Sequence, residues 1–163
     1  MLFRTPIHLT EAHLDSLHSF DCGEQTLNRW LISRAWANET QNISRTYLVF
    51  SEEGDLAGYF SLSSSSICHE ITSAAVRRNM PKPIPTILLT RLAVDVRFQR
   101  MCVGSRMLKS AIEIARQSAG LCGAPFVAVH PLNEKVSEFY RRYGFVYAKQ
   151  GHPLMVFRFA PNN

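Results

Sequence analysis

The sequence predicts an α/β domain, in which a central mixed β-sheet is flanked by helices. Three observations lead to this prediction: two β-rich runs form an antiparallel pair, a long apolar strand follows, and helices and strands alternate after it. The chain has 163 residues, of which 46% are hydrophobic and 19% are charged, as in an ordinary globular core. We therefore expect residues 1–163 to form a single domain.

A helix and a hairpin are expected in the first part of the chain. Phe20-Asp21-Cys22-Gly23 marks a turn, and apolar residues then recur at helical spacing, which predicts one helix of about three turns. Residues 46–50 and 56–62 are β-rich runs on either side of Glu53-Gly54-Asp55, which predicts a hairpin. The serines at 63–66 fit the end of a strand better than a linker.

The remaining elements alternate between strand and helix. Residues 84–94 are mostly apolar but are interrupted by Arg91, which predicts a strand that is buried on both faces for part of its length. Such a strand belongs at the centre of a sheet. Residues 103–117 carry an apolar stripe with most charges outside it, which predicts an amphipathic helix. The last expected elements are a strand at 126–129, a helix at 133–143 that ends at Gly144, and a strand at 154–159.

The charge is distributed unevenly along the chain. Residues 1–75 hold four basic and nine acidic residues, a balance of −5, whereas residues 76–149 hold thirteen basic and four acidic residues, a balance of +9. This asymmetry is hidden in the net charge of +5. A basic C-terminal half is suited to phosphate groups, although a solvated basic surface would show the same balance.

The junction between the central strand and the amphipathic helix is the candidate phosphate site. A strand that turns tightly into a helix exposes unpaired backbone N–H groups beside the positive end of the helix dipole. Arg97, Arg100 and Arg106 add positive charge there. An ordinary basic loop would have the same features, so spacing and charge alone reach only a binder of acyl-CoA-type phosphates.

Two motifs here resemble the signatures of the GNAT N-acetyltransferase family. Gln99-Arg100-Met101-Cys102-Val103-Gly104 is similar to the acetyl-CoA signature Gln/Arg-x-x-Gly-x-Gly/Ala, with Cys102 in place of the first glycine. Asn133 opens a helix that ends in Phe139-Tyr140-x-x-x-Gly144-Phe145, which is similar to the second signature. The resemblance implies the GNAT acyl-CoA N-acyltransferase fold, acetyl-CoA as co-substrate, and acetyl transfer to a primary amine.

Further segments resemble the GNAT toxins of toxin–antitoxin pairs. They are Phe20-Asp21-Cys22-Gly23, Leu27-Asn28-x-Trp30-Leu31, Gly58-Tyr59-Phe60 and residues 77–85, and the resemblance covers roughly residues 20–159. It implies that the chain acetylates the free amine of the amino acid on charged tRNA and so blocks translation. It also implies two protein partners, a ribbon-helix-helix antitoxin and a second copy of the chain in a homodimer.

The resemblance also implies roles for single residues. Tyr140 would be the general acid, because a phenol with a pKa near 10 is protonated at neutral pH and can give its proton to the departing thiolate. The alternative is that Tyr140 only packs in an apolar helical stripe. Asn133 would bind the pantetheine arm or would only cap its helix. The other expected acetyl-CoA contacts are Leu92, Ala93, Val94, Gln99, Arg100, Met101, Cys102, Val103, Gly104 and Ser105.

Two further expectations concern tRNA and the replaced glycine. Arg77, Arg78 and Lys82 would bind the phosphate backbone of tRNA without reading its sequence, and a solvated basic loop would have the same charge. In the signature, glycine lets the backbone curl around the pyrophosphate. We expect a negative φ at Cys102 and a thiol that points away from the ligand.

The cysteine pattern and the hydropathy bear on metal binding and on localisation. Cys22, Cys68, Cys102 and Cys122 are scattered without a CxxC pair, so we expect no metal site, and we expect Cys22, Cys68 and Cys122 to be reduced thiols that pack as small apolar residues. No signal peptide or membrane span is apparent, which favours the cytoplasm. Two alternatives stay open: acetylation of a small amine or a protein N-terminus, and a non-catalytic regulator that binds acyl-CoA or RNA.

Overall fold

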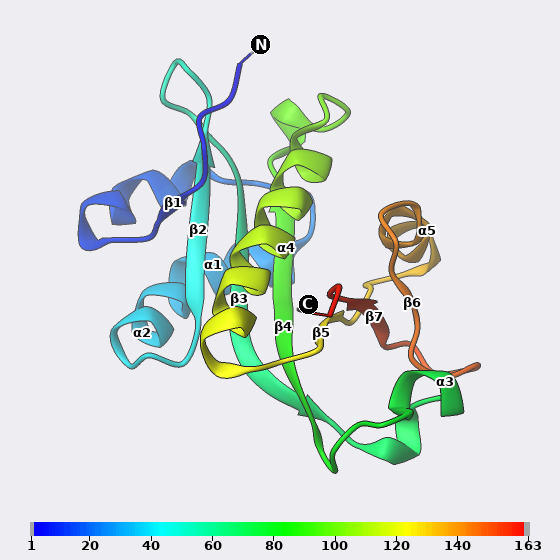
Figure 1. The fold of residues 1–163 in the computed structure, drawn as a ribbon. Coiled ribbons are helices and arrows are strands. Elements are labelled where there is room, and N and C mark those ends of the chain that lie inside the picture. The colour runs from blue at the N-terminus through cyan, green and yellow to red at the C-terminus, as the bar shows by residue number, and fades with distance from the viewer. Residues whose placement is uncertain (1, 162–163) are drawn as a thin grey trace. The chain divides into compact units, whose positions relative to one another are not determined.

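The computed structural model describes residues 2–161, and within this part seven strands form one sheet (Figure 1). The strands are β1 Ile7–His8, β2 Arg45–Phe50, β3 Leu56–Ile67, β4 Ile84–Val94, β5 Phe126–Val129, β6 Val146–Tyr147 and β7 Met155–Arg158. Their order in the sheet is β1-β2-β3-β4-β5-β7-β6. β4 and β5 are parallel, whereas the pairs β1–β2, β2–β3, β5–β7 and β6–β7 are antiparallel. The predicted mixed sheet is therefore confirmed.

Helices occupy most of the connections between these strands. They are the 3₁₀ helices η1 Glu11–Ser19, η2 His69–Ile71 and η3 Val96–Phe98, and the α-helices α1 Gln25–Ser33, α2 Ala35–Thr40, α3 Ala74–Arg77, α4 Val103–Cys122 and α5 Glu134–Arg142. The amphipathic helix expected at 103–117 is α4, and the helix expected at 133–143 is α5. Both predictions are confirmed.

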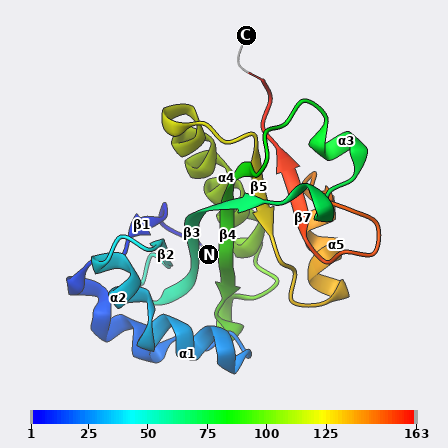
Figure 2. The same ribbon diagram turned by 90° about the horizontal axis from the view of Figure 1, so that it is seen from below.

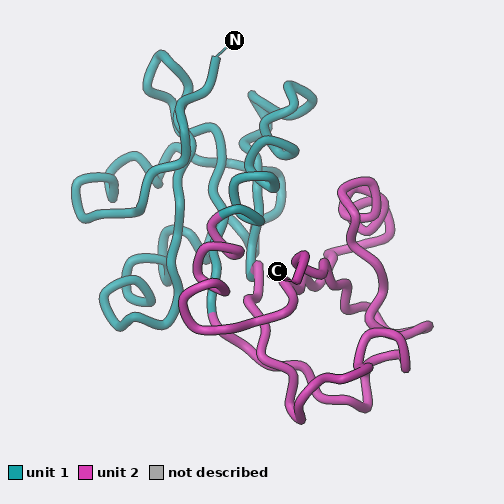
Figure 3. Tube along the Cα trace, in the orientation of Figure 1, with its two compact units in different colours: residues 1–63, 90–113 teal, residues 64–89, 114–163 magenta. Residues whose placement is uncertain are grey.

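The chain forms two compact units, which Figure 3 shows in two colours. Unit 1 contains the residues up to Ser63 together with Thr90–Glu113, and unit 2 contains Ser64–Leu89 together with the residues from Ile114 onward. The second half of β4 and the first half of α4 belong to unit 1. The other halves of both elements belong to unit 2.

In unit 1 helices cover both faces of the sheet. α1 and α2 lie on one face, and the first half of α4 lies on the other (Figures 1 and 2). On the α1 side, Leu31 of α1, Leu48 of β2 and Tyr59 of β3 belong to one buried apolar cluster. On the α4 side, a Cβ added to Gly58 of β3 would lie only 2.5 Å from Met107 Sδ. The missing side chain of Gly58 thus allows close packing of the helix that carries the candidate phosphate loop.

In unit 2 aromatic and aliphatic side chains pack α3 and α5 against the strands. Val76 of α3 packs against an apolar cluster that includes Phe126 of β5. Tyr140 of α5 lies with its ring centroid 5.3 Å from that of Phe145, and Phe145 in turn lies 5.5 Å from Phe157 of β7. These ring contacts fix the orientation of α5 within unit 2.

The N-terminal helix differs from the prediction of one continuous helix. α1 ends at Ser33 and α2 begins at Ala35, because Arg34 leaves the helical conformation with φ −126° and ψ −32°. The hairpin around Glu53-Gly54-Asp55 and the central position of β4 are both confirmed. β1 and β6 were not predicted, because two residues are too few to show a periodic pattern.

The cysteines are free thiols, but only one packs as predicted. Cys22 is partly buried against the apolar cluster of unit 1. The prediction of an apolar packing role is wrong for Cys68 and Cys122, whose side chains are exposed. Cys68 directly follows β3 and Cys122 is the last residue of α4, so both stand where the chain leaves the packed part of an element.

Candidate active site

The candidate phosphate loop connects η3 to α4 in unit 1, and its backbone has two left-handed residues. Arg100 has φ +65° and Cys102 has φ +61°. The expectation of a negative φ at Cys102 is therefore wrong. Glycine, which the acetyl-CoA signature has at this position, adopts a left-handed conformation without strain, and Cys102 adopts it despite its Cβ. The Cys102 side chain is exposed.

The loop presents backbone N–H groups at the start of α4. Val103, Gly104 and Ser105 form the first turn, where N–H groups have no acceptor within the helix. The Cys102 carbonyl begins the hydrogen bonding of the helix, because it accepts from Arg106 N at 3.2 Å and from Ser105 Oγ at 2.9 Å. A left-handed residue followed by helical ones turns successive N–H groups toward one side, which is the geometry of an anion-binding nest.

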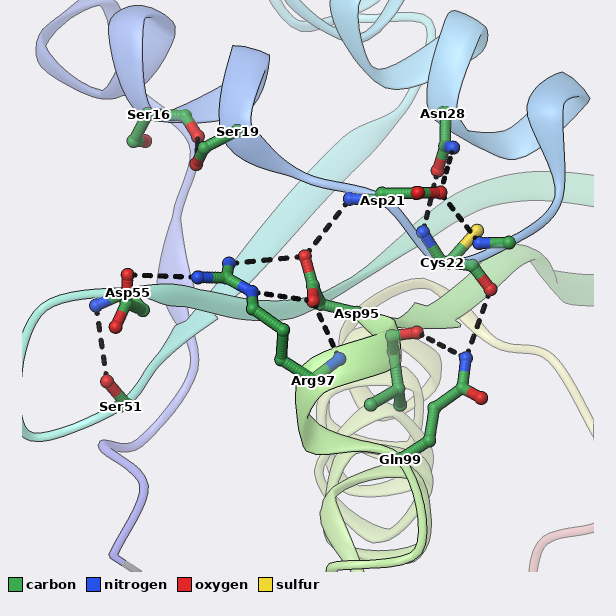
Figure 4. A network of polar contacts seen from close by, with 12 residues as sticks. Ser16, Ser19, Asp21, Cys22, Asn28, Ser51, Asp55, Asp95, Arg97 and Gln99 are labelled. Carbon is green, nitrogen blue, oxygen red and sulfur yellow. Dashed lines mark hydrogen bonds and ion pairs between the residues drawn. The ribbon is translucent and has the colours of Figure 1, made fainter.

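Asp95 holds the residues that lead into the loop through hydrogen bonds (Figure 4). This residue directly follows β4 and is 1% exposed. Its carboxylate accepts hydrogen bonds from Arg97 N and Arg97 Nε, both at 2.9 Å, and from Asp21 N at 3.0 Å. Burial alone would raise the pKa of Asp95, but these hydrogen bonds and the Arg97 charge hold it below its usual value. Asp95 is therefore ionised, and its carboxylate is the shared acceptor that connects Arg97 and Asp21 inside unit 1.

The same network holds the segment before α1. Asp21 Oδ1 accepts from Gly23 N at 2.8 Å and from Asn28 Nδ2 at 2.7 Å, and Asn28 Oδ1 accepts from Cys22 N at 2.9 Å (Figure 4). Hydrogen bonds from Gly23 and Asn28 lower the pKa of Asp21. The turn that was recognised in the sequence is thus locked to the residues that precede the phosphate loop.

Two side chains expected to act on phosphate are engaged within the protein instead. The Arg97 guanidinium forms ion pairs with Asp95 Oδ1 at 2.9 Å and Asp55 Oδ1 at 3.2 Å. Gln99 Nε2 donates to Cys22 O and to Val94 O, both at 3.0 Å (Figure 4). Arg97 is therefore not the mobile positive charge that the sequence suggested. The Gln99 side chain connects the turn before α1 to the end of β4, so only its backbone N–H and C=O groups remain for the expected ligand.

The end of β4 leads into this network. Ala93 is 5% exposed and packs in the apolar cluster of unit 1, whereas Leu92 and Val94 are partly buried. Asp95 N donates to Ala57 O of β3 at 2.9 Å. Leu92, Ala93, Val94 and the loop residues Gln99, Arg100, Met101, Cys102, Val103, Gly104 and Ser105 all belong to unit 1, so the structure gathers these expected acetyl-CoA contacts around one strand-to-helix junction.

Asn133 and Tyr140 both belong to α5, in unit 2. Asn133 is the N-cap, and its Oδ1 accepts from Val136 N at 3.0 Å. Tyr140 is 4% exposed, and burial raises its pKa above the ordinary value. Among residues 2–161 its hydroxyl forms no hydrogen bond. A protonated phenol whose hydroxyl has no hydrogen-bond partner in the described part of the chain suits a proton donor.

Arg77, Arg78 and Lys82 form a separate exposed group in unit 2. Arg77 is the last residue of α3, and its guanidinium donates to the carbonyl of Thr72. Arg78 is the C-cap of the same helix, and Lys82 follows in the connection to β4. All three side chains are exposed, as contacts to a phosphate backbone require.

Asp21 and Asp95 are functional candidates that the sequence reading missed. Asp95 could have been noticed as a charged residue placed directly after a buried strand, because such a charge needs partners. Its bond to Asp21 joins residues 74 positions apart, which no local pattern shows.

In the described part of the chain, no group of three or more His, Cys, Asp or Glu residues could hold a metal ion. Of the helices between residues 2 and 161, none is long and apolar enough to span a membrane.

Comparison with known proteins agrees with this geometry. Residues 12–145 match the Acetyltransferase (GNAT) family. A tRNA-acetylating toxin from Mycobacterium tuberculosis (strain ATCC 25618 / H37Rv) is 38% identical over 143 residues, which are 88% of this chain and 84% of that protein.

Solved structures give the same result. The structure of AtaT complexed with acetyl-methionyl-tRNAfMet superposes with a TM-score of 0.84 at 28% identity and covers 94% of each chain. A mutant AtaT toxin bound to the C-terminus of the antitoxin AtaR and acetyl-CoA superposes with a TM-score of 0.76 at 26% identity, covering 97% of this chain and 94% of that one. The chain therefore belongs to the acetyltransferase (GNAT) family.

Proposed function

We propose that this chain transfers the acetyl group of acetyl-CoA to the primary amine of the amino acid on charged tRNA, and so blocks translation as a toxin. The observation that carries the proposal is the 38% identity, over 88% of the chain, to a protein named for acetylating tRNA. A related structure contains acetyl-methionyl-tRNA and another contains acetyl-CoA, which supports the same pair of substrates. The residues of this chain supply a matching set of groups.

The strand-to-helix junction of unit 1 is the part that binds acetyl-CoA. The backbone N–H groups of Val103, Gly104 and Ser105 have no acceptor within α4, so they can donate hydrogen bonds to the pyrophosphate. The exposed Arg100 adds positive charge. Cys102 has the left-handed backbone conformation that glycine would adopt at this position of the signature. Backbone groups of Leu92, Ala93 and Val94 bind the pantetheine arm and the acetyl carbonyl.

Tyr140 supplies the proton that the reaction needs. The neutral amine attacks the thioester carbonyl, the new C–N bond forms, and the C–S bond breaks to release a thiolate. Tyr140 donates its proton to that thiolate and regains one from solvent, which also takes the proton lost by the amine. Burial keeps the Tyr140 pKa high, so the phenol is protonated throughout the physiological range. Asn133 keeps its capping role and offers its amide N–H group to the pantetheine arm.

The acceptor and the partners complete the proposal. Arg77, Arg78 and Lys82 bind phosphates of the tRNA backbone, which adds affinity without sequence readout. The toxin acts in the cytoplasm, as a single domain over residues 1–163 and as a homodimer. A ribbon-helix-helix antitoxin neutralises it, and the complex of AtaT with the C-terminus of AtaR supports an antitoxin as partner.

Expression in a bacterial host tests the whole proposal. Induction of the wild-type chain should stop growth and amino-acid incorporation into protein, whereas the Tyr140→Phe chain should be tolerated at the same expression level. Growth arrest of equal strength by both chains would contradict the proposal, because the arrest would not depend on acetyl transfer.

A further inference from the structure

Arg91 of β4 lies in a stack of three side chains within unit 1. Its guanidinium carbon is 4.1 Å from the ring centroid of Trp30, which belongs to α1. The ring of Trp30 stacks on that of Tyr59 of β3, with centroids 6.1 Å apart and planes inclined by 11°. Tyr59 is fixed in turn, because its hydroxyl donates to Leu27 O at 2.8 Å. The stack holds the Arg91 guanidinium beside the Trp30 ring.

This guanidinium has no negative partner in the described part of the chain. No carboxylate pairs with it, and no acceptor among residues 2–161 takes its N–H groups; its electrostatic neighbour is the phenol of Tyr59. Partial burial lowers the pKa of Arg91 from its ordinary value, the direction expected for a cation that has lost water without gaining an anion. Arg91 is partly buried, and its N–H groups, which have no acceptor within residues 2–161, are free to bind an anionic ligand.

The position of Arg91 on the strand indicates which ligand it meets. Side chains alternate along β4, so Arg91 points to the same face as Ala93, whose side chain packs toward α1. The next residue along the strand is Leu92, the start of the segment proposed to bind the acetyl group. An anion on Arg91 therefore lies beside the point of acetyl transfer and on the α1 face of the sheet.

On charged tRNA, the nearest anionic group to the reacting amine is the 5′-phosphate of the terminal adenosine. Only the ribose separates this phosphate from the aminoacyl ester. A planar guanidinium held by an aromatic stack can bind such a phosphate through two parallel N–H groups, which a lysine cannot do. Other phosphates of tRNA lie further from the aminoacyl group, where more remote basic residues can reach them.

We propose that Arg91, held by Trp30 and Tyr59, binds the 5′-phosphate of the terminal nucleotide of the acceptor and thereby positions the aminoacyl group for acetylation. This inference rests on the proposed function, because it assigns a positioning residue to the same acceptor. It differs from the role of Arg77, Arg78 and Lys82, which contact the body of the tRNA. Arg91 acts on a substrate as small as one nucleotide.

Two small substrates separate this role from general charge effects. They are a 3′-aminoacylamino-3′-deoxyadenosine and the same compound with a 5′-phosphate, each carrying an amino acid that the wild-type enzyme acetylates on charged tRNA. The amide link keeps them stable to hydrolysis. The measured quantity is the ratio of kcat/KM with and without the phosphate, for wild type, Arg91→Gln, Arg91→Lys and the control Arg29→Gln. Arg29 is an exposed arginine of α1 that precedes Trp30 in the sequence, so Arg29→Gln removes one positive charge and leaves Arg91 in place.

The wild type should prefer the phosphorylated substrate by about 10- to 100-fold, as expected for a charge-assisted hydrogen-bonded pair. Arg91→Gln should reduce the ratio to near one, with kcat/KM for the unphosphorylated substrate changed by less than about threefold. Arg91→Lys should keep a small part of the preference, because it keeps the charge but loses the planar fork. Arg29→Gln should keep all of it.

A wild-type enzyme that acetylates charged tRNA but shows no phosphate preference overturns this inference and leaves the proposed function standing. A preference that survives in Arg91→Gln also overturns it. Absence of acetylation of charged tRNA by the wild type would instead contradict the proposed function. If Arg91→Gln does not fold, as judged by circular dichroism and acetyl-CoA affinity, the comparison of wild type with Arg91→Lys decides, and an unchanged ratio in Arg91→Lys counts against Arg91.

Discussion

Asp95 Oδ2 accepts a hydrogen bond from the backbone N–H of Asp21 at 3.0 Å. The bond ties the turn before α1 to the residue that directly follows β4, and Arg97 donates two further bonds at 2.9 Å to the other carboxylate oxygen. One buried carboxylate thus fixes both the approach to the phosphate loop and the start of α1. The carboxylate is ionised, since these donors lower its pKa despite the burial that would raise it.

Substitution of Asp95 should weaken the fold and the loop together. Asp95→Asn leaves a buried amide N–H group facing Arg97 and Asp21, so the free energy of unfolding should fall by about 1–3 kcal/mol. Urea unfolding measures this loss. The matched control is Asp55→Asn, which removes only the exposed ion pair with Arg97 and should cost less than about 1 kcal/mol. Equal losses of unfolding free energy in the two variants would contradict the role of Asp95 as the shared hydrogen-bond acceptor.

The same carboxylate predicts a pH dependence with a definite sign. A folded pKa below the unfolded value of about 3.9 means that ionised Asp95 stabilises the fold fully above that pH and loses this effect as the pH falls through the folded pKa. The difference in unfolding free energy between wild type and Asp95→Asn should therefore shrink when the pH is lowered from neutral to below about 4. A difference that stays constant with pH would show that Asp95 is not ionised in the fold.

Replacement of Cys102 tests the left-handed loop. Cys102→Gly removes a Cβ from a residue with φ +61°, so the free energy of unfolding should rise by up to about 1 kcal/mol. Cys102→Ala loses the thiol but keeps the Cβ, and its stability should stay at the wild-type level. Because the cysteine already adopts the glycine-like conformation, calorimetry should find acetyl-CoA affinity in Cys102→Gly within about tenfold of wild type. A larger gain would mean that the cysteine impairs the enzyme.

Close packing of β3 against α4 predicts a strong effect at Gly58. In Gly58→Ala the new Cβ would meet Met107 Sδ at 2.5 Å and Ala93 O at 3.0 Å, so the Met107 side chain must move out of its packed position against β3, and stability should fall by about 1–3 kcal/mol. Gly120→Ala is the matched control, because nothing lies within 4 Å of its Cβ, and it should be neutral or slightly stabilising. Equal effects at both positions would rule out the packing argument.

Charge reversal on the exposed basic group separates tRNA binding from acetyl-CoA binding. Arg77→Glu combined with Arg78→Glu should raise the KM for charged tRNA, leave acetyl-CoA affinity nearly unchanged, and flatten the salt dependence of activity. Lys109→Glu reverses an exposed charge on α4 and should leave the tRNA kinetics close to wild type. A parallel loss of acetyl-CoA affinity in the double variant would assign the two arginines to the cofactor instead.

Much of the fold could be predicted because its signals are local. The apolar run of β4, the stripe of α4 and the Asn133 cap with Gly144 at the other end of α5 are each visible within a short window, and the structure contains all three. The break at Arg34 was missed because nothing in the local composition requires it. The edge strands β1 and β6 escaped notice because their pairing partners, rather than their own residues, define them.

The site was predicted in outline but not in its internal bonds. The two signatures located the loop and α5, yet the sign of φ at Cys102 depends on how the backbone connects η3 to α4, which residue type alone does not set. Arg97 and Gln99 each also bind an acceptor far away in the sequence, Asp55 at 42 positions and Cys22 at 77 positions, which no local pattern indicates. Long-range polar networks of this kind have no periodic signal.

The most direct test of the central claim is a single labelling measurement with radiolabelled acetyl-CoA. Wild type and Tyr140→Phe are each incubated with charged tRNA, free polyamines and protein, and acetyl-CoA affinity is measured in parallel. The wild type should label charged tRNA on the amine of its amino acid. Tyr140→Phe should bind acetyl-CoA normally but label charged tRNA about 10²–10⁴ times more slowly, because it keeps the buried ring and loses the proton donor. Label on polyamines or protein with none on charged tRNA, or equal rates for the two chains, would contradict the account.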